Sequence, residues 1–169
     1  MIDFYQSTEE FWVNNPAFSW GWRVSKPYTV THMTWKDVDQ CYPFLYGAAP
    51  SATLEIWRHF CAQGQQSGHT ILVAHNADRY IQGVCAYFET EHLSRGRLIE
   101  VPFLLVASAV DSEGVASALV CALRQACNER SCAAVRVSIP PQGWTDPRLF
   151  SSGEPGDDDA IYFSAAADS

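Results

Sequence analysis

The sequence predicts one α/β (α+β) domain in which helices flank a mixed central sheet with a single parallel β-α-β crossover. Three observations predict this class. The chain has 169 residues, an ordinary length for one domain. Two β-rich runs joined by a short polar loop are typical of a hairpin. A long apolar run is followed by a helical pattern and a further β-rich run within about 40 residues, which is typical of a right-handed parallel crossover.

The N-terminal part predicts an extension, a strand and two helices. Residues 1–26 are aromatic with Asn and Pro breaks, and we interpret them as an N-terminal extension. Alternating β-rich residues over 28–34 predict a strand. Thr34 is suited to an N-cap and Pro43 to a break, so a short helix is expected between them. Apolar residues at helical spacing over 53–63 predict a second helix that ends near a glycine.

The middle of the chain predicts three strands and a helix. The runs 69–75 and 79–89 form the hairpin. The run 96–108 is nearly all apolar, which favours a central strand covered on both faces. Pro102 within it cannot donate to a ladder and indicates a bulge or a gap in pairing. Apolar residues on one face over 114–129 predict a helix.

The C-terminal part completes the crossover. Alternation over 133–139 predicts the parallel partner strand, and 160–165 suggests a last short strand after a loop rich in Pro, Gly, Ser and Asp. The segment 146–169 is acidic. We find no internal repeat, so residues 1–169 are interpreted as one domain.

Composition narrows the class of function. The net charge of −8 argues against nucleic-acid binding and is compatible with a cationic substrate such as an amine. The six cysteines form no C-x-x-C pair, so reduced thiols in a cytoplasmic protein are expected, with disulfides as the lesser option. The sequence predicts no signal peptide and no membrane span. The early aromatic cluster would favour a homodimer if it is exposed.

The stretch Val110–Val120 lies at the expected start of the helix after the central strand. Free amide hydrogens at a helix start attract anions such as phosphate. Gly114 would allow close approach, but Asp111 and Glu113 carry the same sign of charge as phosphate. The stretch is therefore a working anion cradle, a decayed one, or an ordinary helix start capped by Asp111 or Ser112.

At these residues the chain resembles the GNAT superfamily of acyltransferases. That family has the same element order, a mostly antiparallel sheet, and a Gln/Arg-x-x-Gly-x-Gly/Ala motif after its fourth strand that binds the pyrophosphate of acetyl-coenzyme A. Here the motif reads DSEGVA, so Gly114 and Ala116 match while Asp111 departs from it. The resemblance covers about residues 28–140.

The resemblance implies an N-acyltransferase that moves an acetyl or other acyl group from coenzyme A to a small-molecule or protein amine by direct transfer. It implies that the pyrophosphate meets backbone amides of Glu113, Gly114, Val115, Ala116 and Ser117. It also implies that the pantetheine arm pairs with the backbone of Leu105, Val106 and Ser108, and that an amide near Val106 stabilises the oxyanion.

Glu100 is the candidate general base, because some histone-type members place a glutamate at this offset before the second small residue. A carboxylate among apolar residues is suited to take a proton from an ammonium. The alternative is that Glu100 faces a solvated edge or pairs with Arg97. Glu89 and Glu91 either line the acceptor side or end a strand in solvent.

One feature of the sequence weakens the catalytic hypothesis, and another argues against a metal site. The family's tyrosine-bearing helix after the fifth strand has no counterpart in IPPQGWTDPRLF, and Tyr162 cannot be placed. No metal site is expected, since His69 and His75 lack partners at metal-site spacing. The runner-up hypothesis is a decayed GNAT-fold binding or regulatory module, followed by an unrelated α+β domain.

Overall fold

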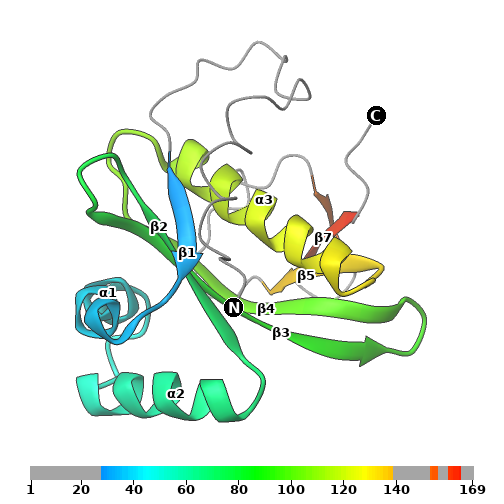
Figure 1. The fold of residues 1–169 in the computed structure, drawn as a ribbon, viewed down its shortest axis with the longest axis horizontal. Helices are drawn as coiled ribbons and strands as arrows, with labels where there is room; N and C mark the ends of the chain where they lie inside the picture. Colours follow the sequence, from blue (N-terminus) through cyan, green and yellow to red (C-terminus); the bar gives the residue numbers. More distant parts are fainter. Residues whose placement is uncertain (1–27, 139–152, 156–159, 165–169) are drawn as a thin grey trace, which may run out of the picture.

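The computed structural model describes residues 28–138, 153–155 and 160–164. In this part of the chain a seven-stranded sheet has the order β1-β2-β3-β4-β5-β7-β6, and three helices pack against it (Figure 1). The strands are β1 (Thr29–His32), β2 (Thr70–His75), β3 (Ile81–His92), β4 (Gly96–Val106), β5 (Ala134–Ser138), β6 (Glu154–Pro155) and β7 (Ala160–Ser164). The helices are α1 (Trp35–Ala48), α2 (Leu54–Gln66) and α3 (Ser112–Glu129).

The pairing of the strands confirms the predicted class. Every neighbouring pair is antiparallel except β4 and β5, which run parallel and are joined through α3. The β2–β3 hairpin and the β4–α3–β5 crossover therefore form as predicted. Together they give a mixed, mostly antiparallel sheet.

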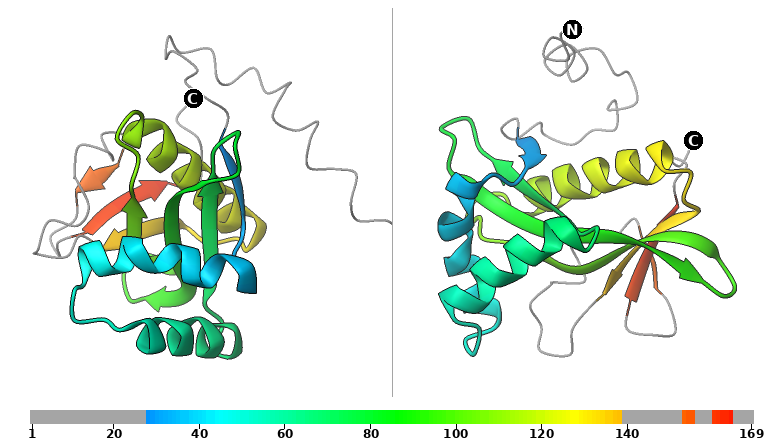
Figure 2. Two further views of the ribbon diagram at one scale, coloured as in Figure 1. Left: turned by 90° about the vertical axis from the view of Figure 1, so that its left-hand side faces the viewer. Right: turned by 60° about the horizontal axis from the view of Figure 1, so that its bottom comes forward.

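The two faces of the sheet carry different helices. In β2, Leu72 and Ala74 pack into the cluster that contains α3, whereas Ile71 and Val73 pack into the cluster that contains α1 and α2. This alternation is the two-residue period of a strand buried on both faces. Figure 2 shows α3 on one side of the sheet and the two N-terminal helices on the other.

The first turns of α3 lie directly on the sheet. A Cβ atom added to Gly83 of β3 would lie 2.7 Å from Cγ1 of Val115 and 3.2 Å from the carbonyl oxygen of Leu105. Glycine at this position therefore allows the helix to approach β3 and β4 closely. Val115 and Ala116 are fully buried by this contact, so the start of the helix is fixed relative to β4.

Several predicted boundaries differ from the observed ones. The prediction that Pro43 ends the first helix is wrong, because α1 continues through it to Ala48. Pro43 is exposed, and the burial of Val38 and Cys41 against the sheet holds the helix despite the missing amide hydrogen. β3 runs further than predicted because His92 pairs with Gly96.

Other differences are small. β4 ends at Val106 rather than at residue 108, and the two-residue strand β6 was not predicted. The predicted extension 1–26 and most of the acidic segment 146–169 lie outside the described residues. Among the described helices, none combines the length and the apolarity needed to cross a bilayer.

Candidate functional site

The central strand β4 has a bulge near the point where its pairing with β5 ends. Ala86 of β3 pairs with Phe103 and Phe88 pairs with Glu100, so Tyr87 faces both Val101 and Pro102. The proline thus lies in the predicted bulge. The parallel register with β5 covers Leu98–Val101 only, while β4 continues along β3 to Val106.

The start of α3 contains a hydrogen-bonded cluster, here called the cap cluster, formed by Tyr28, Ser108, Asp111 and Gly114. Asp111 is the N-cap, and its Oδ1 accepts a hydrogen bond of 3.0 Å from the backbone amide of Gly114. Its Oδ2 accepts one of 3.1 Å from the Tyr28 hydroxyl. The Asp111 amide donates to Oγ of Ser108 at 3.2 Å. The carboxylate is therefore held by the residue before β1 and by the helix, while Ser108 holds the backbone of Asp111.

Gly114 is required by this carboxylate. A Cβ atom on Gly114 would collide with the Asp111 side chain, 2.7 Å from Oδ1 and closer still to Oδ2. Aspartate at the N-cap, bound to the amide three residues on, is a common and stabilising arrangement. The space that Gly114 leaves in the GNAT-like motif is therefore filled by the Asp111 carboxylate.

The other residues that the resemblance assigns to the cofactor lie around this helix start. Glu113 and Ser117 are exposed, whereas the side chains of Val115 and Ala116 point into the core. On the preceding strand and loop, Leu105 is buried, and Val106 and Ser108 are partly exposed. The structure therefore brings the predicted residues to one end of β4.

A second polar group, here called the strand row, crosses three neighbouring strands on the face away from α3. It consists of Glu100, Arg136, Ser138 and Tyr162. Glu100 pairs with Arg136 in the β4–β5 register, and Arg136 pairs with Tyr162 in the β5–β7 register.

Direct contacts link the side chains of the strand row. Nη1 of Arg136 donates to Oε1 of Glu100 at 2.5 Å, and its Nε donates to the Tyr162 hydroxyl at 3.1 Å. Oγ of Ser138 also donates to Oε1 of Glu100 at 2.9 Å. The ion pair is largely withdrawn from water, with side chains 20% and 12% exposed for Arg136 and Glu100.

The alternative pairing of Glu100 with Arg97 is wrong. The two residues are three positions apart in an extended strand, so their side chains point to opposite faces. Arg97 instead binds Glu89, which also contacts Arg130 of α3. Glu89 therefore belongs to the α3 face, away from Glu100.

Aromatic side chains flank Glu100 on its own face. Phe88 lies opposite it on β3 and contacts the ring of His69, with 4.8 Å between ring centroids. Phe60 of α2 lies 6.1 Å from Phe103. These four rings are partly exposed, whereas Trp57, which contacts Phe60 and Phe103, is fully buried. The surroundings of Glu100 therefore suit an acceptor with an apolar body.

The cysteines offer no activated nucleophile. All six cysteines are free thiols in the structure. Burial raises the pKa of Cys41, Cys61 and Cys85 to about 12 and that of Cys127 to about 11. Thiols with such values remain protonated near neutral pH and are poor nucleophiles. In the described part of the chain, no three His, Cys, Asp or Glu side chains gather as a metal site would require.

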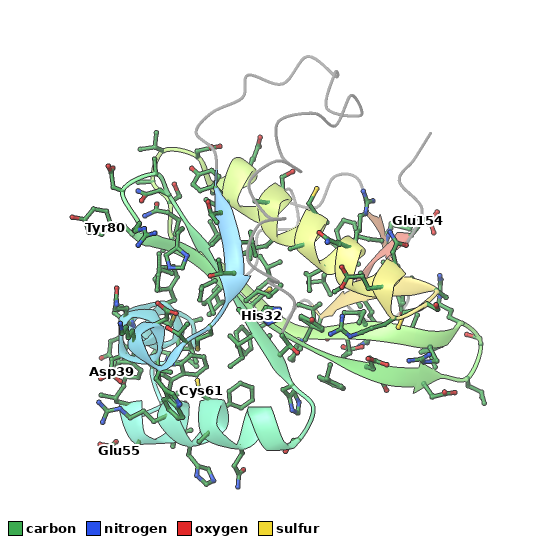
Figure 3. All side chains as sticks on the ribbon, viewed as in Figure 1. His32, Asp39, Glu55, Cys61, Tyr80 and Glu154 are labelled. Carbon is green, nitrogen blue, oxygen red and sulfur yellow. The ribbon has the colours of Figure 1, made fainter. Side chains whose placement is uncertain are left out.

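A cavity of about 260 Å³ opens at the edge of the sheet, and His69 is among its lining residues. His32 at the end of β1 and Cys61 on α2, both labelled in Figure 3, are among its lining residues. Tyr28 precedes the other end of β1 and binds Asp111 there. The cavity is therefore separate from the start of α3.

Sequence reasoning missed Arg136, Ser138 and Tyr28 and did not place Tyr162. Arg136 lies between two valines in the predicted parallel strand, which is a recognisable signal for a cation on the polar face of the sheet. Its partner could not be named without the β4–β5 register. Tyr28 and Tyr162 gave no local signal, because their contacts join residues 83 and 26 positions apart.

Comparison with known proteins supports the fold. No protein-family model and no curated protein matches the chain. A probable acetyltransferase of known structure matches with a TM-score of 0.63 at 20% identity, over 76% of this chain and 91% of that one. A transcriptional regulator from Bacillus halodurans C-125 matches with 0.61 at 20%, over 75% and 91%.

An acetyltransferase of the GNAT family from Staphylococcus aureus Mu50 matches with a TM-score of 0.59 at 11% identity, over 83% of this chain and all of that chain. At these identities the likeness concerns the fold. The chain has the GNAT fold, with its mostly antiparallel seven-stranded sheet and single parallel pair.

Proposed function

We propose that this chain is an N-acyltransferase that moves an acetyl or other acyl group from coenzyme A to an amine by direct transfer. The observation that carries the proposal is the course of β4. This strand parts from its parallel partner after Val101, continues along β3, and leads into a helix start that carries Gly114 and Ala116. A ligand that binds helix-start amides is thereby placed beside the same strand as Glu100.

The residues at the two ends of the proposed donor site fit coenzyme A unequally. The backbone of Leu105, Val106 and Ser108 lies beyond the parallel pairing, where an extended pantetheine arm would run. The diphosphate end does not fit in the observed state, because Asp111 occupies the amide of Gly114 and the space over its Cα atom. Donor binding therefore requires a shift of this side chain.

Glu100 is the proton acceptor in this proposal. An ammonium has no lone pair, so the acceptor amine must lose a proton before it attacks the thioester carbonyl. Glu100 takes that proton, directly or through a water, once the amine replaces Arg136 or Ser138 beside the carboxylate. As the C–N bond forms the C–S bond breaks, and the second proton of the nitrogen ends on the sulfur.

The thiols support direct transfer. An acyl-enzyme intermediate needs an ionised nucleophile, and the raised pKa values of the buried cysteines oppose one. Six free cysteines also favour a reducing compartment, so we place the protein in the cytoplasm as part of this proposal.

The test combines binding with turnover. Calorimetry measures coenzyme A binding, and release of free thiol from acetyl-coenzyme A is followed with a panel of amines. Glu100→Gln should lower kcat by about 100-fold or more and leave the coenzyme A Kd unchanged. Glu89→Gln is the matched control, since this carboxylate also binds arginines but on the α3 face. Absence of coenzyme A binding at millimolar concentration would remove the proposal.

The cap cluster favours a second candidate function, a GNAT-fold binding or regulatory module without turnover. In that case the Asp111 carboxylate would stay at the start of α3, and no diphosphate would replace it. A folded chain that binds neither coenzyme A nor any thioester of it would support this candidate.

A further inference from the structure

The start of α3 already holds an anion. The amide hydrogens of a helix start, together with the helix dipole, stabilise one negative group. In this chain that group is the Asp111 carboxylate, which accepts from the Gly114 amide at 3.0 Å and lies against the Gly114 Cα atom. Because the carboxylate belongs to the chain, it is present beside the helix start at any ligand concentration and competes with any anion that binds there.

Two further contacts hold Asp111 in place, one at its carboxylate and one at its backbone amide. The Tyr28 hydroxyl binds its other oxygen, and Oγ of Ser108 accepts the hydrogen of its backbone amide. Tyr28, Ser108 and Asp111 are all partly buried. Displacing the side chain therefore breaks its hydrogen bonds to the Gly114 amide and the Tyr28 hydroxyl, and a diphosphate bound beside it would meet a like charge at short range.

A donor without a diphosphate does not meet this competition. The thioester end of coenzyme A is pantetheine, an uncharged chain that would lie along β4, away from the Asp111 carboxylate. The cap cluster therefore acts on one end of the donor only. Its effect is to reduce the gain in affinity that the nucleotide part of coenzyme A would otherwise provide.

We propose that Asp111 is a specificity-determining residue for the acyl donor. It competes with the donor's diphosphate for the start of α3, so that the chain distinguishes little between acyl-coenzyme A and an acyl thioester of pantetheine. This inference rests on the proposed function and concerns the donor end of the same site.

The test compares two donors in three proteins. Acetyl-coenzyme A and S-acetylpantetheine share the thioester, and only the first carries phosphates. Asp111→Asn keeps the shape and an acceptor for the Gly114 amide while removing the charge. Glu129→Gln is the control, because it removes the same charge from an exposed position at the other end of α3, roughly 25 Å away at 1.5 Å per residue.

In the Asp111→Asn variant, kcat/KM and affinity for acetyl-coenzyme A should rise about tenfold or more, since one removed like charge near a diphosphate is worth at least about 1.4 kcal/mol. The values for S-acetylpantetheine should change less than about twofold, and Glu129→Gln should leave the ratio of the two donors as in the wild type.

An unchanged ratio in Asp111→Asn would overturn the inference and leave the acyltransferase proposal standing. This includes an equal rise for both donors, because the effect of the charge would then not concern the diphosphate. If neither donor binds to wild type or variant, the proposed function itself fails.

Discussion

The cap cluster and the strand row each hold one carboxylate of the proposed site, but with different partners. Asp111 is bound by neutral donors, the Gly114 amide and the Tyr28 hydroxyl. Glu100 is bound by a guanidinium and a hydroxyl. The Gly114 amide and the Tyr28 hydroxyl are uncharged groups beside a helix start, whereas the guanidinium beside Glu100 forms an ion pair with that carboxylate.

This difference bears on how each region would respond to a substrate. At the start of α3 the Asp111 carboxylate opposes an anion that approaches the Gly114 amide. The strand row has almost no net charge, so an ammonium gains access to Glu100 only by displacing Arg136 or Ser138. Binding of an anionic donor is therefore opposed by repulsion from Asp111. Binding of an ammonium requires that it replace a partner of Glu100.

The largest effect should come from removing the cation of the strand row. Arg136→Met leaves a mostly buried Glu100 carboxylate without its counter-ion, and the free energy of unfolding should fall by about 3 kcal/mol. Urea denaturation measures this change. In the double variant with Glu100→Gln, more than half of the loss should be recovered. Equal losses in the single and double variants would show that the two charges are not coupled.

The next largest effect should come from a substitution in β3, beneath the first turns of α3. In Gly83→Ala the new Cβ would meet the stiff, fully buried Val115 and the Leu105 carbonyl, so the free energy of unfolding should fall by about 1–3 kcal/mol. The strand row should be unaffected, because it lies on the other face.

Gly47→Ala is the matched control for that substitution. Nothing lies within 4 Å of a Cβ at Gly47, which is in the last turn of α1. Alanine is the better helix former, so this variant should be more stable than wild type by up to about 1 kcal/mol. Equal effects of the two substitutions would contradict close packing at Gly83.

A smaller effect is expected in the cap cluster itself. Asp111→Ala removes the N-cap of α3 and should lower the free energy of unfolding by about 1 kcal/mol. Asp111→Ser retains a capping oxygen and should lie closer to wild type. Thermal denaturation of both variants measures this order, and a reversed order would argue against the Gly114 amide as the partner that matters.

The two regions also differ in how far sequence predicts them. The cap at Asp111 was among the alternatives at the sequence level, because an aspartate and an amide three residues on are joined by local geometry. The pairing of Glu100 with Arg136 spans 36 residues and depends on the register of a parallel crossover. Alternation alone placed the carboxylate on a strand but gave two wrong surroundings, the solvent edge and Arg97.

The same contrast holds for the fold. Hairpin, crossover and central strand followed from periodicity, and Pro102 marked its bulge because proline cannot donate to a ladder. The prediction that α1 ends at Pro43 was wrong, because burial of neighbouring residues against the sheet outweighs one missing hydrogen bond. Residues of the described site with partners far along the chain, such as Tyr28, were not predicted.

The smallest expected effect concerns pH and the Tyr28 hydroxyl. Burial and, after it, the hydrogen bond to the Asp111 carboxylate raise the pKa of Tyr28 above its ordinary value near 10. The folded state therefore binds this proton more tightly than the unfolded state, and the resulting stability is fully present below about pH 10 and lost as the pH rises through the raised pKa.

Tyr28→Phe should remove that part of the pH dependence. The difference in unfolding free energy between wild type and variant, measured by urea denaturation from pH 8 to pH 11.5, should be constant at first and shrink above about pH 10. Taking the difference cancels the other tyrosines and the cysteines, which titrate in both proteins. A constant difference would mean that the hydroxyl is not held by the Asp111 charge. The Asp111 carboxylate would then be held by the Gly114 amide and not by Tyr28. The cap cluster would differ from the strand row only in its contact with the start of α3.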